Sequence, residues 1–211
     1  MNVTKRDGDQ EDYDVEKIHK VVQWATRGIN GVSFSDIEMN ANLSLYDGIS
    51  TSHIHKILIK STSDLISTSA PNYQYVAARL LNMQLRKEVW GDSKPTNFIV
   101  FLEKNVDDGI YDPKFLEKWN KDDLNIFHNY INHGRDDLFT YAGLQQLIDK
   151  YLVKNRSTGK IYETPQFAYM SIAMCLFDEA EEVKKAYDSY STFKINLPTP
   201  IMAGVRTNIK Q

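Results

Sequence analysis

The strongest constraint on the fold is a run of four amphipathic segments within residues 1–91. In the first of them, apolar side chains recur at three- and four-residue steps through residues 15–25, after an expected N-cap at Asp14 and before a stop at Gly28. Three further segments begin near Phe34, near Thr51 and after Pro71. This spacing predicts four helices, each with one apolar face, that can share a single core.

A short hairpin is predicted ahead of these helices. Asp7 and Gly8 stand between two short extended pieces, and an Asp-Gly pair in that setting is a strong signal for a tight turn between antiparallel strands. Residues 1–91 are therefore expected to form a hairpin laid over four helices, ending at Gly91.

A capping pattern marks the expected start of the second helix. Ser35 and Glu38 have the spacing of a capping box, in which each side chain accepts a hydrogen bond from the backbone at the position of the other. Phe34 and Met39 can then form an apolar contact across the cap.

The remaining residues, 92–211, predict a second helical region. A helix is expected after Asp112, and another begins at Thr164, where Pro165 suits the first helical position. Between them, residues 151–154 and 160–163 are expected to be two short strands around a Ser-Thr-Gly turn.

Composition excludes several classes of protein. The net charge is −3 over 211 residues, so the chain lacks the basic excess of proteins that coat DNA. No secretory signal and no stretch long enough to span a bilayer is apparent, which makes a cytoplasmic protein the expectation. The single cysteine, Cys175, excludes an internal disulfide or a cysteine-rich zinc site, and its apolar neighbours predict a buried thiol. His128 and His133 have no further ligand at metal-binding spacing and are interpreted as surface or interface residues.

Several cations lie where a phosphate could bind. Lys5 belongs to the hairpin and Lys17 to the first helix, while Thr51 stands at the N-terminus of the third helix, whose first N–H groups favour anions. The chain contains neither the GxxxxGK[ST] nor the GxGxxG nucleotide motif. Spacing alone therefore leaves two readings open, a phosphate site or scattered solvated lysines.

Three stretches of residues 1–91 resemble an ATP-cone, the N-terminal regulatory domain of many ribonucleotide reductase large subunits. They are VTKRDG with DVEKIHKVV, then DGISTSHIHKILIKS, then PNYQYVAARLLNMQLRKEVWG, at consistent spacing. The resemblance implies that ATP or dATP binds as an allosteric effector between the hairpin and the helices.

Carried over by motif position, the resemblance implies effector contacts from the hairpin and from three of the helices. The residues are Lys5, Glu11, Asp12, Tyr13, Asp14, Val15, Glu16, Lys17, Thr51 and Lys87. His55 is either a further contact or an exposed helix histidine. Gln84 stands where some family members carry histidine, which leaves the response to dATP open.

Residues 135–207 resemble the segment that opens the catalytic part of class I ribonucleotide reductase large subunits. RDDLFTYAG and IYETPQFAYM are the strongest pieces, and LPTPIMAGVRT resembles the lead-in and first strand of a ten-stranded α/β barrel. The implied fold class is mainly α with small β elements (α+β). An ATP-cone spans residues 1–91, and a helical domain leading into the first barrel strand spans residues 92–211. The same resemblance implies that Thr199 contributes to binding the substrate diphosphate.

The implied enzyme is a ribonucleoside-diphosphate reductase, a radical enzyme dependent on thioredoxin or glutaredoxin that supplies deoxyribonucleotides for DNA synthesis. In that family the catalytic cysteines follow the first barrel strand, and Cys175 matches none of them. We therefore expect no catalytic residue and no metal in this chain, and no activity from it alone; a natural split and a truncation are both compatible with this. The expected partners are the C-terminal remainder of the large subunit, in the same or a separate chain, a radical-generating small subunit and a second large subunit, with neither DNA nor membrane.

The main alternative is a stand-alone nucleotide-sensing module without enzymatic activity. Repressors that join an ATP-cone to a zinc ribbon need four cysteines, and this chain has one. A helical interaction module without a ligand is a further alternative. It predicts no nucleotide binding and leaves LPTPIMAGVRT unexplained.

Overall fold

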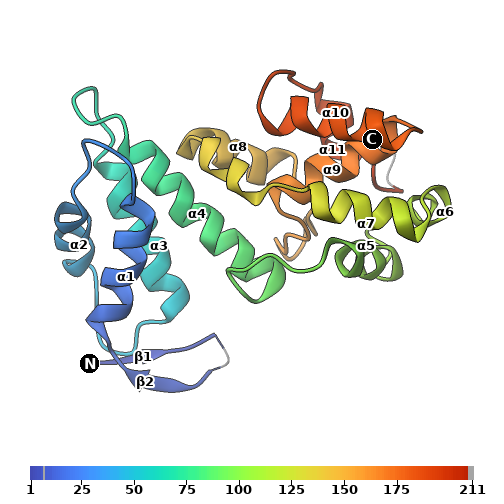
Figure 1. The fold of residues 1–211 in the computed structure, drawn as a ribbon. Coiled ribbons are helices and arrows are strands. Elements are labelled where there is room, and N and C mark those ends of the chain that lie inside the picture. The colour runs from blue at the N-terminus through green and yellow to red at the C-terminus, as the bar shows by residue number, and fades with distance from the viewer. Residues whose placement is uncertain (7, 209–211) are drawn as a thin grey trace. The chain divides into compact units, whose positions relative to one another are not determined.

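A computed structural model describes residues 1–6 and 8–208, which form two compact units. The first unit holds Met1–Gln84 and Phe139–Gln145, and the second holds Leu85–Leu138 and the described residues from Gln146 onward. Helices dominate both units, and a two-stranded sheet lies in the first (Figure 1). The expected α+β class, mainly helical with small β elements, is confirmed.

The first unit combines a hairpin with four helices. Strands β1 (Asn2–Thr4) and β2 (Gln10–Asp12) are antiparallel, with Val3 opposite Glu11. The helices are α1 (Val15–Thr26), α2 (Phe34–Asn42), α3 (Thr51–Asp64) and α4 (Tyr73–Trp90), the last of which continues into the second unit. Gly8 of the turn has a φ of 93°, whereas Asp7 lies outside the described residues.

Local signals in the sequence account for α1. The Asp14 side chain accepts a hydrogen bond from the backbone of Glu16, as expected of an N-cap, and Gly28 follows the helix with a φ of 72°. Ile18, Val22 and Ala25 are buried on the face that the periodicity predicts. They pack in one core whose fully buried members include Ile37, Ile49, Val76 and Leu80.

The predicted start of α2 is wrong by two residues. Ser33, not Ser35, is the N-cap, and its hydroxyl accepts from the backbone of Asp36. Phe34 and Met39 are exposed and form no buried staple. The reason is tertiary, because the backbone N–H of Ser33 donates to the hydroxyl of Tyr73 on α4 at 2.9 Å, and this contact fixes where the helix begins.

The second unit is built from short helices around α9. The elements are α5 (Phe98–Asp107), α6 (Lys114–Lys118), α7 (Lys121–Tyr130), the 3-10 helix η1 (His133–Leu138), α8 (Tyr141–Lys150), α9 (Pro165–Leu176), α10 (Ala180–Ser191) and α11 (Thr199–Gly204). Helix α8 begins in the first unit. Every residue of α9 from Pro165 to Met174 is buried, so this helix is the centre of the unit.

Two predictions of β structure in the second unit are wrong. Residues 151–154 and 160–163 form a single antiparallel bridge, Lys154 to Ile161, instead of two strands. The Asn155 side chain holds the backbone of the intervening turn, and no neighbouring strand extends the pairing among the described residues. The expected first barrel strand at residues 197–207 is instead helix α11, because a strand needs a pairing partner and Pro200 suits a first helical turn.

Residues 1–6 and 8–208 contain neither a membrane-spanning helix nor a cluster of metal-ligating side chains. No helix there is long and apolar enough to cross a membrane. Within the same residues, His, Cys, Asp and Glu side chains nowhere gather in a group of three or more that could hold a metal ion.

Candidate nucleotide site and the polar core of the second unit

A cluster of three charged side chains joins the hairpin to α1. The Glu11 carboxylate lies 3.2 Å from Lys5 Nζ and 2.9 Å from Lys17 Nζ, so one anion is shared by two cations. The hydrogen bonds from Lys17 and then Lys5 lower the pKa of Glu11. The sequence predicted these three residues as part of one site, and the structure brings them together.

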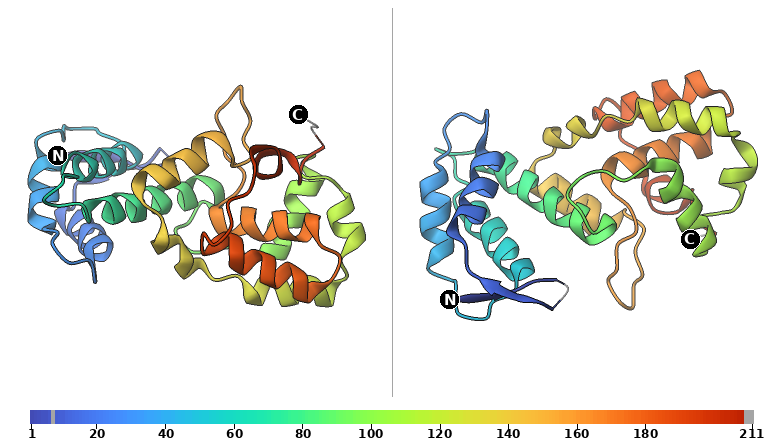
Figure 2. Two further views of the ribbon diagram at one scale, coloured as in Figure 1. Left: turned by 90° about the horizontal axis from the view of Figure 1, so that it is seen from above. Right: turned by 60° about the horizontal axis from the view of Figure 1, so that its bottom comes forward.

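The start of α3 is attached to the same hairpin. The backbone N–H of Thr4, next to Lys5, donates to the carbonyl of Ile49 at 3.0 Å, and β1 runs beside the residues that enter α3 (Figure 2). Ser50 caps α3 by accepting from the backbone of His53. Thr51 is the first residue of the helix, where N–H groups have no preceding turn to pair with and the helix dipole favours an anion.

The other residues predicted around Glu11 form the connection from β2 into α1. Asp12 ends β2, Asp14 caps α1, and Val15 and Glu16 are its first exposed residues. Tyr13 packs against the core of the first unit, and burial, with a smaller contribution from the charge of Glu38, raises its pKa. A contact of these residues with a nucleotide stays a prediction.

His55 is buried, so its reading as an exposed helix histidine is wrong. Its side chain is 6% exposed, and Nε2 lies 2.7 Å from the carbonyl oxygen of Leu80. Because a carbonyl only accepts, the ring donates from Nε2, and this bond ties α3 to α4 inside the first unit. Gln84, one turn beyond Leu80, is also buried.

Two predicted site residues belong to the second unit. Lys87 lies in the last turn of α4, and Thr199 is the exposed first residue of α11. Their roles in binding effector and substrate stay predictions.

A buried ion pair that the sequence analysis missed lies in the second unit. Arg206 and Glu163 are 1% and 0% exposed, and the guanidinium donates to both carboxylate oxygens, with Nε at 2.8 Å from Oε2. The hydroxyl of Tyr111 and the backbone N–H of Val153 also donate to this carboxylate. Burial and the charge of Glu163 raise the pKa of Tyr111, and the charge of Glu163 raises the pKa of Arg206 against the effect of burial.

The same arginine anchors the segment that contains α11. Its guanidinium donates to the carbonyls of Met202 at 2.7 Å and Tyr151 at 3.1 Å, while its own carbonyl accepts from the backbone of Asp112 at 3.1 Å. The signal that could have found it is a charged residue directly after the apolar residues 201–205, because a buried charge needs a partner. Glu163 likewise directly follows Ile161 and Tyr162.

A second polar network links three elements of the second unit to the end of α4. Arg86 is 2.7 Å from Asp136 of η1, which accepts from Gln166 of α9 at 2.8 Å. Gln166 in turn accepts from the hydroxyl of Tyr187 on α10 at 2.6 Å. The half-buried ring of His133 lies against these elements, and burial, followed by the charges of Arg86 and His128, lowers its pKa to about 3.

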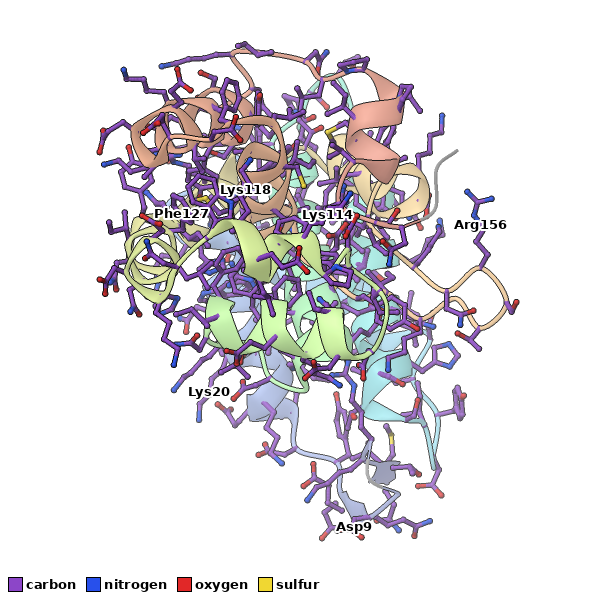
Figure 3. All side chains as sticks on the ribbon, turned by 90° about the vertical axis from the view of Figure 1, so that its right-hand side faces the viewer. Asp9, Lys20, Lys114, Lys118, Phe127 and Arg156 are labelled. Carbon is purple, nitrogen blue, oxygen red and sulfur yellow. The ribbon has the colours of Figure 1, made fainter. Side chains whose placement is uncertain are left out.

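Cys175 and a cleft complete the second unit. Cys175 is partly buried instead of fully buried as predicted, and burial raises the pKa of its thiol to about 12. A cleft of about 750 Å³ lies between the connection from α8 to α9 and the residues that follow α11, with Tyr151 and Thr207 among its lining residues. Arg156, also on the lining, stands at the outer end of that connection (Figure 3).

Comparison with known proteins first defines the class. The family described as "ATP cone domain" matches residues 1–88, which contain the hairpin, α1, α2 and α3 and most of α4. The family described as "Ribonucleotide reductase, all-alpha domain" matches residues 137–210.

Individual relatives agree with this class. The chain is 46% identical to ribonucleoside-diphosphate reductase 1 subunit alpha of Escherichia coli strain K12, over 99% of this chain and 28% of the relative. It is 45% identical to subunit alpha of Haemophilus influenzae, over 100% of this chain and 29% of the relative. For subunit alpha of Enterobacteria phage T4 the identity is 44%, over 100% of this chain and 28% of the relative.

The chain belongs to the ribonucleotide reductase large-subunit family and corresponds to its N-terminal part. It spans about 28% of the length of the curated relatives that it matches.

Proposed function

We propose that this chain binds an adenine nucleotide, ATP or dATP, as an allosteric effector where the hairpin meets α1 and α3. The observation that carries the proposal is the convergence of Lys5 and Lys17 on the carboxylate of Glu11, in a hairpin whose strand β1 is hydrogen-bonded through Thr4 to Ile49, just before the N-terminus of α3. Cations and the N–H groups of a helix N-terminus both favour a triphosphate, and Lys5, Lys17 and the start of α3 supply them. The match of residues 1–88 to the ATP cone domain supports this assignment.

We also propose that the chain is the N-terminal portion of a ribonucleoside-diphosphate reductase large subunit. Its relatives carry that name, and it spans about 28% of their length. The proposed reaction reduces ribonucleoside diphosphates with electrons from cysteines. Cys175 is unsuited to thiol–disulfide exchange, which proceeds through the thiolate, because burial raises its pKa to about 12.

The catalytic cysteines would therefore lie on the C-terminal remainder of the large subunit, in the same or a separate polypeptide. A radical-generating small subunit and a second large subunit are the further proposed partners. Within this chain, the exposed hydroxyl of Thr199 would contribute a hydrogen bond to the substrate diphosphate.

Regulation by dATP would require more than one cone. ATP and dATP differ by one hydroxyl, and one hydrogen bond contributes about 0.5–1.5 kcal/mol net. Moving a two-state equilibrium from 1:99 to 99:1 takes about 5.5 kcal/mol. Several cones coupled in an oligomer could supply that difference. Steep dATP inhibition of a monomeric enzyme would contradict this proposal.

Calorimetric titration of the chain with ATP tests the effector site. The wild-type protein should bind ATP, and Lys17→Gln should weaken binding about tenfold or more, because it removes a charged hydrogen-bond donor. Lys60→Gln is the matched control, since Lys60 pairs with Asp64 on the exposed side of α3 and should leave the affinity unchanged. A wild-type chain that binds no ATP would overturn the effector proposal.

The alternative, a stand-alone sensor without enzymatic activity, also predicts ATP binding. It is separated by mixing the chain with a polypeptide that contains the C-terminal remainder of the large subunit. Co-elution on size-exclusion chromatography and recovery of diphosphate reduction would support the reductase. ATP binding without association would support the sensor.

A further inference from the structure

Glu11 forms ion pairs with the two lysines that would bind a phosphate. Its carboxylate is shared between Lys5 at 3.2 Å and Lys17 at 2.9 Å. The side chain of Glu11 is 24% exposed, whereas those of Lys5 and Lys17 are 41% and 60% exposed. The cations are thus accessible to a ligand from solvent, and the anion that holds them is the more covered member of the cluster.

The register of the hairpin explains this placement. Glu11 is the cross-strand partner of Val3, and directly opposed residues of an antiparallel pair project from the same face. Val3 is buried in the core of the first unit at 4% exposure, so Glu11 is on the face of the hairpin that turns toward the helices. It therefore meets Lys17 of α1 instead of projecting into solvent.

We propose that the Glu11 carboxylate competes with phosphate for Lys5 and Lys17. It pairs with both lysines until a nucleotide displaces it, and this competition sets the affinity of the effector site. The inference rests on the proposed nucleotide binding and changes the role of Glu11 from a contact of the ligand to its rival. In the empty site the carboxylate keeps two ammonium groups close together that would otherwise repel each other. When a phosphate arrives, the carboxylate must either release a lysine or remain beside a second anion, and both alternatives oppose binding.

The Glu11 carboxylate should weaken the binding only of ligands that carry phosphate. Adenosine has no group that needs the lysines, so its affinity should not depend on the charge of Glu11. Exposed ion pairs are individually weak, and loss of two of them corresponds to a change in affinity of about three- to tenfold. Glu11→Gln should therefore tighten ATP binding by about that factor and leave adenosine binding unchanged.

The experiment is a calorimetric titration of the full chain with ATP and with adenosine. Asp64→Asn is the matched control, because it makes the same change in net charge and breaks an exposed Lys–Asp pair at the other end of α3. Helix α3 has 14 residues, which places that pair about 20 Å along the axis from Thr51. The control should bind ATP like the wild type.

The outcomes separate this inference from the proposed function. If the wild type binds no ATP, both are overturned. If the wild type binds ATP and Glu11→Gln binds it equally or more weakly, only the competitor role is overturned, and weaker binding would make Glu11 a contact of the nucleotide. Glu11→Asp, which retracts the carboxylate by one methylene, serves as a second variant if the glutamine variant does not fold, and it should tighten ATP binding by a smaller factor.

A double-mutant cycle gives an independent measurement. Because Glu11 neutralises part of the charge of Lys17, Lys17→Gln should cost a larger factor in ATP affinity in the Glu11→Gln background than in the wild type. Equal losses in the two backgrounds would contradict competition between the carboxylate and the phosphate.

Discussion

Both units contain carboxylates shared between two or more donors, and two of these, Glu11 and Glu163, differ in burial. Glu11 bridges two lysines at a partly exposed surface of the first unit. Glu163 binds Arg206, Tyr111 and a backbone N–H in the interior of the second unit, where it is 0% exposed. A similar arrangement of charges therefore serves two different purposes.

The two clusters differ because solvent reaches the one around Glu11 and is excluded from the one around Glu163. At the surface, solvent screens the ion pair and can replace either partner, so the cluster contributes little to stability and can be opened by a ligand. In the interior no solvent is available to replace a lost partner, and an unpaired charge there is strongly destabilising. The surface cluster is suited to binding, and the buried one to holding the segment around α11 in place.

The largest expected effect comes from breaking the buried cluster. Glu163→Gln leaves the guanidinium of Arg206 without its counter-ion and should lower the free energy of unfolding of the second unit by about 3–5 kcal/mol. Urea denaturation followed by the fluorescence of Trp90 and Trp119, both in that unit, measures the change. A loss below about 1 kcal/mol would show that the ion pair does not anchor the segment.

An intermediate effect is expected where the ion pair is only partly shielded. The side chains of Arg86 and Asp136 are 17% and 3% exposed. Asp136→Asn should lower the free energy of unfolding by about 2 kcal/mol, less than Glu163→Gln, because water can reach the arginine. Asp108→Asn, which breaks the exposed pair with Lys104, is the control and should change stability by less than about 0.5 kcal/mol. The reverse order of the two effects would contradict the role assigned to burial.

A smaller effect should appear as a pH dependence of the second unit. Burial and the charge of Arg86 lower the pKa of His133 from 6.5 to about 3. The unfolded chain therefore takes up a proton below about pH 6.5 that the folded chain refuses until about pH 3, so stability is full above pH 6.5 and falls as the pH decreases toward 3.

Between pH 7 and pH 6 the loss attributable to His133 should be about 0.7 kcal/mol, measured by denaturation at both values. His133→Gln should reduce the difference between the two pH values by that amount. His53→Gln, at an exposed position on α3, should retain the full difference. A pH difference equal in wild type and His133→Gln would exclude His133 as its source.

The smallest expected effect on stability is that of Glu11→Gln. Its ion pairs are exposed, so thermal or chemical denaturation should show little change in the free energy of unfolding of the first unit. The same substitution should change ATP affinity, as set out above. A large loss of stability would show that Glu11 stabilises the fold as Glu163 does, and it would contradict the contrast between the two carboxylates.

Local patterns predicted much of the first unit and part of the second. The face of α1 that carries Ile18 and Val22, the cap at Asp14 and the stop at Gly28 are confirmed, because each depends on residues within one or two helical turns. The start of α2 at Ser33 was missed because Tyr73, 40 residues away, holds that backbone. The strand expected near Thr199 from the resemblance is wrong, because a strand depends on a pairing partner, and residues 199–204 form helix α11 instead. The domain limits at residues 91 and 92 and the nucleotide contacts stay predictions.

The sequence by itself determined the four helices and the hairpin of the first unit and, by resemblance, the family, because these rest on short-range spacing and on motifs read in order. Tertiary structure alone decided which charges meet. Glu11 is near Lys17 in the chain, but its orientation depends on the register with Val3. Arg206 lies 43 residues from Glu163, and His55 lies 25 residues from Leu80. Side chains so distant in sequence meet only when packing excludes water between them, and that same exclusion makes one shared carboxylate a structural anchor while the other remains open to exchange.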